Sequence, residues 1–366
     1  MFTSLVKRLF PSANGDSQPN YFYFEDNKAE EQEQQEQAVE ELQDSLAAKS
    51  VSLVSPEEQH QKAFYDFLFG QPSRGEHHDE LSIYITNKIE KLLQTPTHIL
   101  QVLPVLPASL AKVLEQVNDR EFDTEAVIAL IQQEPAIAAK VTELANSSFY
   151  NHSDREITDL KSAFMLLGQD GLMQGVLNGF VNQLTPAPSV YFRQYGDKIW
   201  QHSLSTGVVA REIIAQSAYK QEAAPGYLLG LICNLGDMII FQLLMEAFSF
   251  VHPDCQPNTY AFKNLLYENS KKLTYHIAKH WQFPPSILDA LALQAKLTKS
   301  AMLQPLFIKR PVACYVYEAN IISELAMRFE HGELEEAQMI TAKEHLLYSR
   351  EAKQHLEQLT NPEPVS

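Results

Sequence analysis

Apolar side chains recur at helical spacing through most of this 366-residue chain, and this feature limits the possible folds more than any other. Such spacing places apolar residues on one face of a helix that packs against its neighbours. The first three helices that it predicts carry the apolar residues Leu110, Val113, Leu114 and Val117, then Val127, Ile128 and Ile131, then Ile137, Val141 and Leu144. Further helices are predicted over 171–184, 197–217, 224–248, 260–281, 285–297, 311–330 and 334–358. No convincing strand alternation follows residue 80, so the expected fold class is all-α, a multi-helix bundle.

Residues that favour helix ends mark several boundaries of these segments. Ser55, with Glu58 three residues later, is typical of a capping box, in which the two residues bond each other's backbone amides. Thr124 is expected to cap a helix and Pro135 to lie in the first turn of the next. Gly168 predicts a helix end, because glycine readily adopts the left-handed conformation found there.

Charge is distributed unevenly along the chain. The formal net charge is −17, and residues 1–80 account for −10 of it, with 16 acidic and 6 basic residues. This concentration of charge predicts an acidic, Glu/Gln-rich N-terminal extension over 1–80, partly disordered or helical. The succession of segments with helical periodicity predicts a helical domain over 95–300, with a C-terminal helical segment over 301–366 packed on it. No basic stripe is present to neutralise phosphates, so nucleic acid is not an expected partner.

The N-terminal extension has too few apolar residues in its first half to bury much surface. Residues 30–41 contain six Glu and four Gln, and such runs bury too little apolar area to offset the entropy cost of ordering. We expect the first 50 residues to contribute little to the core, except the aromatic residues 21–24, which should pack on the body. Residues 70–80 have the composition of a linker.

Cysteine usage and apolar stretches indicate a cytoplasmic protein without a membrane span. The three cysteines, Cys233, Cys255 and Cys314, show no close pairing, which fits a reducing compartment. The first ten residues make a poor signal peptide. The most apolar stretch, 227–251, contains Asn, Asp, Gln and Glu side chains, which a membrane span would rarely hold. We therefore interpret it as a helix buried in protein.

Several motifs together resemble one known family. They are LPVLP at 103–107, EPAIAAKVTELANSSFY at 134–150, ITDLKSAFMLLG at 157–168, Trp-Gln-His-Ser at 200–203, GYLLGLICNLGDMII at 226–240 and HWQFPPSILDAL at 280–291. In this order they are similar to the HDOD domain, an HD-related output domain of bacterial signalling proteins. The resemblance covers roughly residues 95–300 and implies an HD-like helical bundle with N- and C-terminal helical extensions.

The resemblance also implies that the metal chemistry of the parent HD fold is lost. HD phosphohydrolases hold a divalent metal with a His and an adjacent His-Asp pair, and His202 matches the first of these ligands. Cys233 and Asn234 replace the pair, Ser270 takes the position of a downstream His, and the later His-His falls near residues 293–294. Asp237 stands where the active pattern commonly has Lys. We therefore expect no catalytic residue, no bound metal and no cofactor.

His202, Cys233, Asn234 and Asp237 are the candidates for a remnant pocket. His202 is either a residue of that pocket or a core histidine held by hydrogen bonds. Asp237 is the one residue that could rescue a metal site, because it adds a negative charge three residues beyond Asn234.

Three functions remain open on the sequence. The first is a non-catalytic regulatory module that binds an unidentified signalling protein. The second is a metal-dependent phosphohydrolase with a rebuilt site. The third is a sensor whose old pocket binds a small ligand or nucleotide without hydrolysing it, and a polar cavity around His202 would favour this third function.

Overall fold

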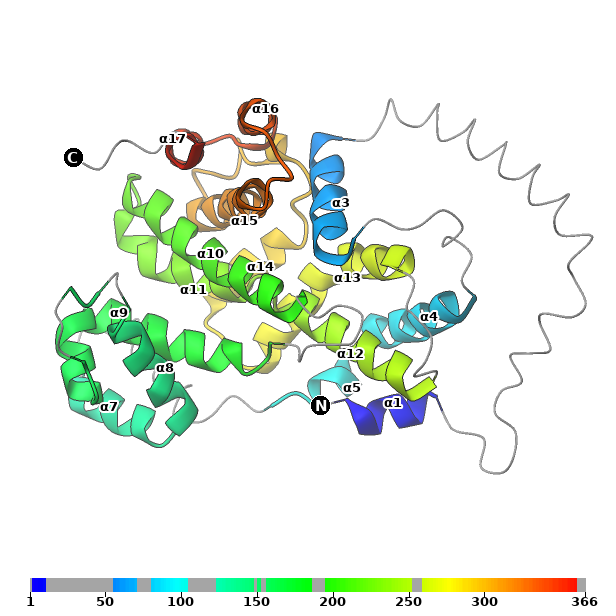
Figure 1. Ribbon diagram of the computed structural model, residues 1–366, viewed down its shortest axis with the longest axis horizontal. Coiled ribbons are helices and arrows are strands. Elements are labelled where there is room, and N and C mark those ends of the chain that lie inside the picture. The colour runs from blue at the N-terminus through cyan, green and yellow to red at the C-terminus, as the bar shows by residue number, and fades with distance from the viewer. Residues whose placement is uncertain are drawn as a thin grey trace, which may run out of the picture.

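The chain is an assembly of helices, shown in Figure 1 as a computed structural model that describes residues 2–10, 55–70, 80–104, 123–147, 150–152, 156–185, 195–251 and 259–360. Within these ranges it forms no strand, which confirms the all-α fold class. The aromatic residues 21–24, the Glu/Gln-rich run 30–41, the linker residues 71–79 and the helix expected around 110–117 lie outside the described residues.

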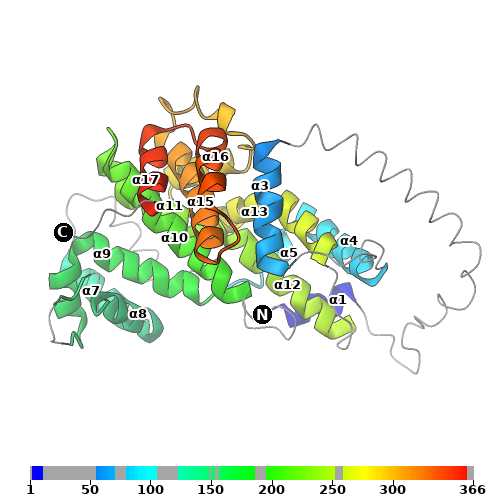
Figure 2. The same ribbon diagram turned by 45° about the horizontal axis from the view of Figure 1, so that its top comes forward.

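The α-helices are α1 (Thr3–Leu9), α3 (Pro56–Phe69), α4 (Glu80–Gln94), α5 (Thr97–Leu100), α7 (Thr124–Gln132), α8 (Pro135–Ala145), α9 (Leu160–Asn182), α10 (Tyr195–Ala215), α11 (Ala223–Ile232), α12 (Leu235–Val251), α13 (Thr259–His280), α14 (Pro285–Gln294), α15 (Pro311–Glu330), α16 (Glu336–Leu346) and α17 (Arg350–Thr360). In the middle of the molecule α10, α11 and α15 pack on one another. At one end α7, α8 and α9 form a lobe, and at the other α12 and α13 are covered by α1 and α4 (Figure 1). Figure 2 shows α16 and α17 lying over α15.

Most predicted helix boundaries agree with the structure, and one cap is corrected. Ser55 and Glu58 form the complete capping box at the start of α3. Pro135 occupies the first turn of α8 as expected. The cap of α7, however, is Asp123, whose carboxylate accepts a hydrogen bond from the amide of Ala126, so the prediction of Thr124 is wrong by one residue. Aspartate caps well because its oxygen reaches a free amide of the first turn.

Gly168 does interrupt a helix, but the chain resumes helical structure immediately after it. Its φ of +67° lies inside α9 and bends that helix. The predicted helix 334–358 is also divided, into α16 and α17.

The predicted helix 224–248 is divided at Cys233 and Asn234 into α11 and α12. Thr274 of α13 satisfies the backbone amide of Gly236 that this break releases. Its hydroxyl oxygen accepts a 2.8 Å hydrogen bond from the amide of Gly236 and lies 3.3 Å from the carbonyl oxygen of Cys233. A Cβ atom on Gly236 would lie 1.9 Å from the carbonyl oxygen of Ser270. The break thus depends on a close approach between α12 and α13 that only glycine permits.

The stretch Lys220–Val251 is long and apolar enough to cross a membrane by composition, but 89% of its most apolar window is buried inside the protein. This burial is typical of a core helix and agrees with the interpretation of 227–251.

The N-terminal segment contributes more to the core than the sequence predicts. Phe2, Leu5, Val6 and Phe10 are between 0% and 5% exposed, and α1 packs against α12. The amide of Phe2 also donates to a carboxylate oxygen of Glu246 at 3.0 Å. The expectation that the first 50 residues contribute little is therefore wrong for residues 2–10, because their apolar face has a partner that lies more than 200 residues away.

Helix α3 is the second N-terminal element that enters the core. It packs against α10, α13, α15 and α16 and stands beside α13 in both views (Figures 1 and 2). The buried side chains of this helix are those of His60, Phe64, Tyr65, Phe67, Leu68 and Phe69.

Candidate functional site

The structure brings the four candidate residues to the region where α11 breaks and α12 begins. His202 lies on α10, Cys233 and Asn234 form the break, and Asp237 lies in the first turn of α12. Asn320 of α15 connects three of them. Its side-chain oxygen accepts a 3.1 Å hydrogen bond from Asn234 and lies 3.7 Å from the sulfur of Cys233, and its amide nitrogen donates to Glu324, the neighbour of His202, at 2.7 Å.

His202 is a buried core histidine with partners on two sides. Its Nδ1 lies 3.0 Å from the hydroxyl oxygen of Ser323, which itself donates to the His202 carbonyl oxygen at 3.2 Å. Burial lowers the pKa of His202 to about 4, so the ring is neutral at pH 7.

Glu324 is a buried carboxylate that lies between two histidines. One oxygen is 2.7 Å from Nε2 of His60 and the other is 3.7 Å from Nε2 of His202. Burial opposes its ionisation, but the hydrogen bond from His60 and the neighbouring charges hold the pKa of Glu324 below its usual value. Glu324 therefore remains a carboxylate, with its two oxygens directed to different histidines.

Asp237 belongs to a separate hydrogen-bonded group, not to the surroundings of His202. Its Oδ1 accepts from the hydroxyl of Tyr65 at 2.8 Å and from the hydroxyl of Ser270 at 2.9 Å. Burial raises the pKa of Asp237 to about 6. Asp237 and Ser270, two positions at which this chain departs from the parent pattern, thus bind each other.

These residues do not fit a divalent metal, which the parent fold implies. Cys233 is a single thiol whose sulfur contacts the carbonyl oxygen of Gly230 and the side-chain oxygen of Asn320, which are not the thiolate or imidazole co-ligands that a soft metal prefers. Asn234 supplies a neutral amide whose nitrogen is already bonded to Asn320. Among the described residues no group of three or more His, Cys, Asp or Glu side chains is arranged to hold a metal ion.

Two sets of residues that complete this cluster are not predicted by the sequence. The first is the α3 face, in which His60 contacts Glu324, the ring of Phe64 lies 4.8 Å from that of His202, and Tyr65 contacts Asp237. The second is the polar side of α15. The sequence does carry signals for both, namely four aromatic residues within 64–69 and polar residues in the otherwise apolar helix 311–330.

A cavity of about 290 Å³ opens beside the cluster. Its wall includes His60, Asn320 and Glu324, together with Lys271 and other residues of α13, α14 and α15. His202 is not in the lining, and the nearest lining side chain that contacts it is that of Glu324.

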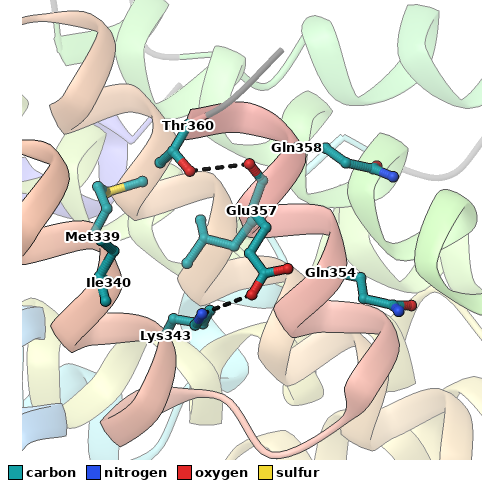
Figure 3. Close-up of a pocket in the computed structure, with 8 residues that line it drawn as sticks. Met339, Ile340, Lys343, Gln354, Glu357, Gln358 and Thr360 are labelled. Carbon is teal, nitrogen blue, oxygen red and sulfur yellow. Dashed lines mark hydrogen bonds and ion pairs between the residues drawn. The ribbon is translucent and has the colours of Figure 1, made fainter. Parts of the chain in front are cut away.

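A larger hollow of about 880 Å³ lies between α16 and α17 (Figure 3). There Lys343 is ion-paired with Glu357 at 2.7 Å, and Thr360 donates to the Glu357 carbonyl oxygen. None of the four candidate residues lines either hollow. The smaller cavity borders their hydrogen-bond partners Asn320 and Glu324, so we place the candidate site there.

We expect Asp237→Asn to stabilise the protein near neutral pH and to have less effect in acid. The Asn oxygen can accept both hydrogen bonds without a buried charge. Because the folded-state pKa of Asp237 is raised from 3.8 to about 6, its contribution to stability is fully present below pH 3.8 and is lost as the pH rises through 6. That shift corresponds to at most about 3 kcal/mol. Urea unfolding of the wild type and of Asp237→Asn at about pH 4 and about pH 7.5 measures the difference in unfolding free energy. A difference that does not change with pH contradicts the raised pKa of Asp237.

Sequence comparison finds one curated relative. A protein of uncharacterised function from Treponema pallidum (strain Nichols) is 23% identical over 160 residues, which cover 43% of this chain and 30% of that protein. The matched part of the chain therefore spans less than a third of the relative's length.

One solved structure shows the same fold, and a second is similar. The crystal structure of an HDOD domain protein of unknown function from Geobacter sulfurreducens matches with a TM-score of 0.50 and 15% identity, over 74% of this chain and 88% of that one. A protein from Shewanella amazonensis SB2B, whose name proposes a phosphohydrolase, matches with a TM-score of 0.49 and 17% identity, over 72% and 93% of the two chains. The sequence model of the HDOD domain matches residues 103–297. Since this match covers more than half of the chain, the protein belongs to the HDOD family.

Proposed function

We propose that this protein is a non-catalytic signal-transduction module that regulates a signalling protein by binding it. Family membership gives the class of function, because the HDOD resemblance implies an output domain of bacterial signalling. The observation that supports a non-catalytic role is the position of α3. Three of its side chains contact the remnant pocket: His60 binds Glu324, Phe64 covers His202 and Tyr65 binds Asp237.

Occupation of the remnant pocket by α3 is compatible with binding of a protein partner. It is unfavourable for metal-assisted hydrolysis. Hydrolysis of the parent kind needs an open coordination position for water beside anionic or imidazole ligands. Here an aromatic ring lies against the one matching histidine, and the nearby carboxylates have protein partners. A folded regulatory surface requires neither a free ligand nor an open pocket.

Metal content and hydrolysis test the proposal against the rebuilt phosphohydrolase. We expect chelator-free protein to contain no stoichiometric manganese, magnesium or zinc and to leave bis(p-nitrophenyl) phosphate intact when any of these ions is added. His280→Ala, at an exposed histidine of α13, is the control for His202→Ala. Stoichiometric metal that disappears in His202→Ala or Asp237→Ala but persists in the control would contradict the proposal.

A binding experiment tests the regulatory part. Because α1 and α3 belong to the core, the useful deletion is 11–50, which leaves both helices in place. We expect affinity capture with the full chain to yield a signalling protein, and the purified pair to form a complex in size-exclusion chromatography. Comparison of the full chain with the 11–50 deletion shows whether this acidic segment takes part in binding the captured protein. A captured protein that fails to bind the purified chain directly would refute the assignment of that partner.

A further inference from the structure

We infer that an enclosed cavity between α9, α11 and α14 binds a small neutral molecule that is mainly apolar and carries one hydrogen-bond acceptor, such as a ketone oxygen. The cavity has a volume of about 130 Å³ and shares no lining residue with the two hollows described above. Its apolar wall includes Met173, Leu177, Leu228, Leu229, Ile287 and Ala290. None of the four remnant-pocket candidates is in this wall, so the inference goes beyond the proposed function and does not depend on the protein partner.

The size and composition of the wall set the class of ligand. Met173, Leu177 and Ile287 are 4–5% exposed, so the interior of the cavity is apolar. An engineered apolar cavity of about 150 Å³ in another protein binds benzene, so a cavity of this size holds a molecule of roughly six to nine non-hydrogen atoms. Among the described residues that line the cavity there is no Lys, Arg or His, and Glu222 is exposed. Because burial of an unpaired charge is costly, a neutral ligand is favoured over an ion.

Gln174 of α9 gives the cavity a hydrogen-bond donor without a partner. This residue is 6% exposed and lines the cavity. Its side-chain oxygen accepts a 2.8 Å hydrogen bond from Nη1 of Arg211 and one of 3.2 Å from the hydroxyl of Tyr150. Because a guanidinium group can only donate, the atom that faces Arg211 is the oxygen, which fixes the position of the amide nitrogen. That nitrogen makes no hydrogen bond with any residue that the structure describes.

The unpartnered donor of Gln174 needs an acceptor, because leaving a buried donor unpaired costs more than a typical hydrogen bond contributes. Ordered water is one acceptor, but a buried water typically makes about three hydrogen bonds. Tyr227, the other deeply buried polar residue of the wall, already donates its hydroxyl hydrogen to Asn178 at 2.6 Å. A bound ketone oxygen pairs with the Gln174 amide, while the rest of the molecule contacts the apolar wall.

The position of the cavity links the ligand to the arrangement of the helices. Helix α9 packs on α7 and α8, with which it forms the lobe at one end of the molecule (Figure 1). Helix α11 packs on α10 and α15, and α14 packs on α13 and α15. A ligand that contacts α9, α11 and α14 therefore holds the lobe against the rest of the protein, and hydrogen exchange of residues 160–182 should slow when it is bound.

Titration of the full chain with acetophenone and with toluene, followed by saturation-transfer NMR, tests the inference. Both molecules have an aromatic ring of suitable size, but only acetophenone carries an acceptor. Gln174→Glu removes the amide donor and keeps an oxygen for Arg211 and Tyr150. It should weaken acetophenone binding by at least about fivefold and change the Kd of toluene by less than about twofold.

A second variant tests the cavity itself. Ala224→Leu fills part of the cavity and should weaken the binding of both molecules by at least about tenfold. Ala292→Leu is the matched control, since Ala292 is also a half-buried helical alanine and is not in the wall. Circular dichroism establishes that each variant folds, and if Ala224→Leu does not, Gln174→Glu decides alone.

The possible results separate clearly. Saturable binding of acetophenone with the expected losses in Gln174→Glu and Ala224→Leu supports the site. Absence of saturation by acetophenone up to about 10 mM overturns the inference. An equal effect of Gln174→Glu on both molecules, or equal affinity in the two leucine variants, also overturns it. The charged analogues benzoate and 1-phenylethylamine should bind at least about tenfold more weakly than acetophenone, and tighter binding of either contradicts the neutral class of ligand.

Discussion

The Gly236→Ala variant is expected to lose more than about 3 kcal/mol of unfolding free energy. The added Cβ would lie 1.9 Å from the carbonyl oxygen of Ser270 and 2.6 Å from its carbonyl carbon. Overpacking of flexible side chains typically costs about 1–3 kcal/mol, and here the neighbour is backbone that cannot rotate away. Separation of α12 from α13 would also weaken the hydrogen bonds that Thr274 and Ser270 make across this contact.

Urea unfolding followed by circular dichroism measures this loss. Gly179→Ala is a graded control, because its Cβ would lie 3.0 Å from Cα of Ile137, a milder overlap. The expected order of stability is wild type, then Gly179→Ala, then Gly236→Ala. A Gly236→Ala protein within about 1 kcal/mol of the wild type would mean that α12 and α13 are not in close contact at this point.

The second large effect is expected for Phe64→Ala on α3, with a loss of about 3–5 kcal/mol, the range for deletion of a buried phenylalanine ring. Phe64 is 3% exposed, and its ring lies 4.8 Å from His202 and 6.1 Å from Phe67. Removal leaves a cavity next to a buried polar cluster. The unfolding transition of the whole chain should shift, because α3 packs on α10, α13 and α15.

Lys62→Ala provides the comparison within the same helix. Lys62 is exposed, so its replacement should change stability by less than about 0.5 kcal/mol. If Phe64→Ala behaves like Lys62→Ala, α3 is an appendage and not part of the core. The proposed non-catalytic function would then lose its main support, which is the packing of α3 against the remnant pocket.

Local sequence pattern accounts for most of the helices but not for the break between α11 and α12. The apolar residues on both sides of Cys233 continue at helical spacing, and Asn234 and Gly236 are only weak local signals for a break there. The break is stabilised by Thr274, which is 38 residues beyond Gly236 and satisfies its amide. Tertiary contacts of this kind override helix propensity.

The sequence predicts only part of the candidate site, because contacts between distant segments complete it. The family motif identifies His202, Cys233 and Asn234, and the structure links these three through Asn320 and Glu324. Asp237, three residues beyond Asn234, does not join this group and instead binds Tyr65 and Ser270. Periodicity shows that a side chain is buried, but it does not identify the distant segment that buries it.

The docking of α3 has a consequence for synthesis of the chain on the ribosome. His60 and its partner Glu324 are separated by 264 residues. At a translation rate of about 5–20 residues per second, α3 waits roughly 13–50 s before α15 is made. Phe64 and Tyr65 lack His202 and Asp237 until α10 and α12 are made, and Phe67 lacks His331 until the end of α15 is made. Unpartnered aromatic surfaces of this kind attract chaperones or other nascent chains. The rate at which the last helices emerge therefore sets how long this N-terminal helix is exposed to misassembly.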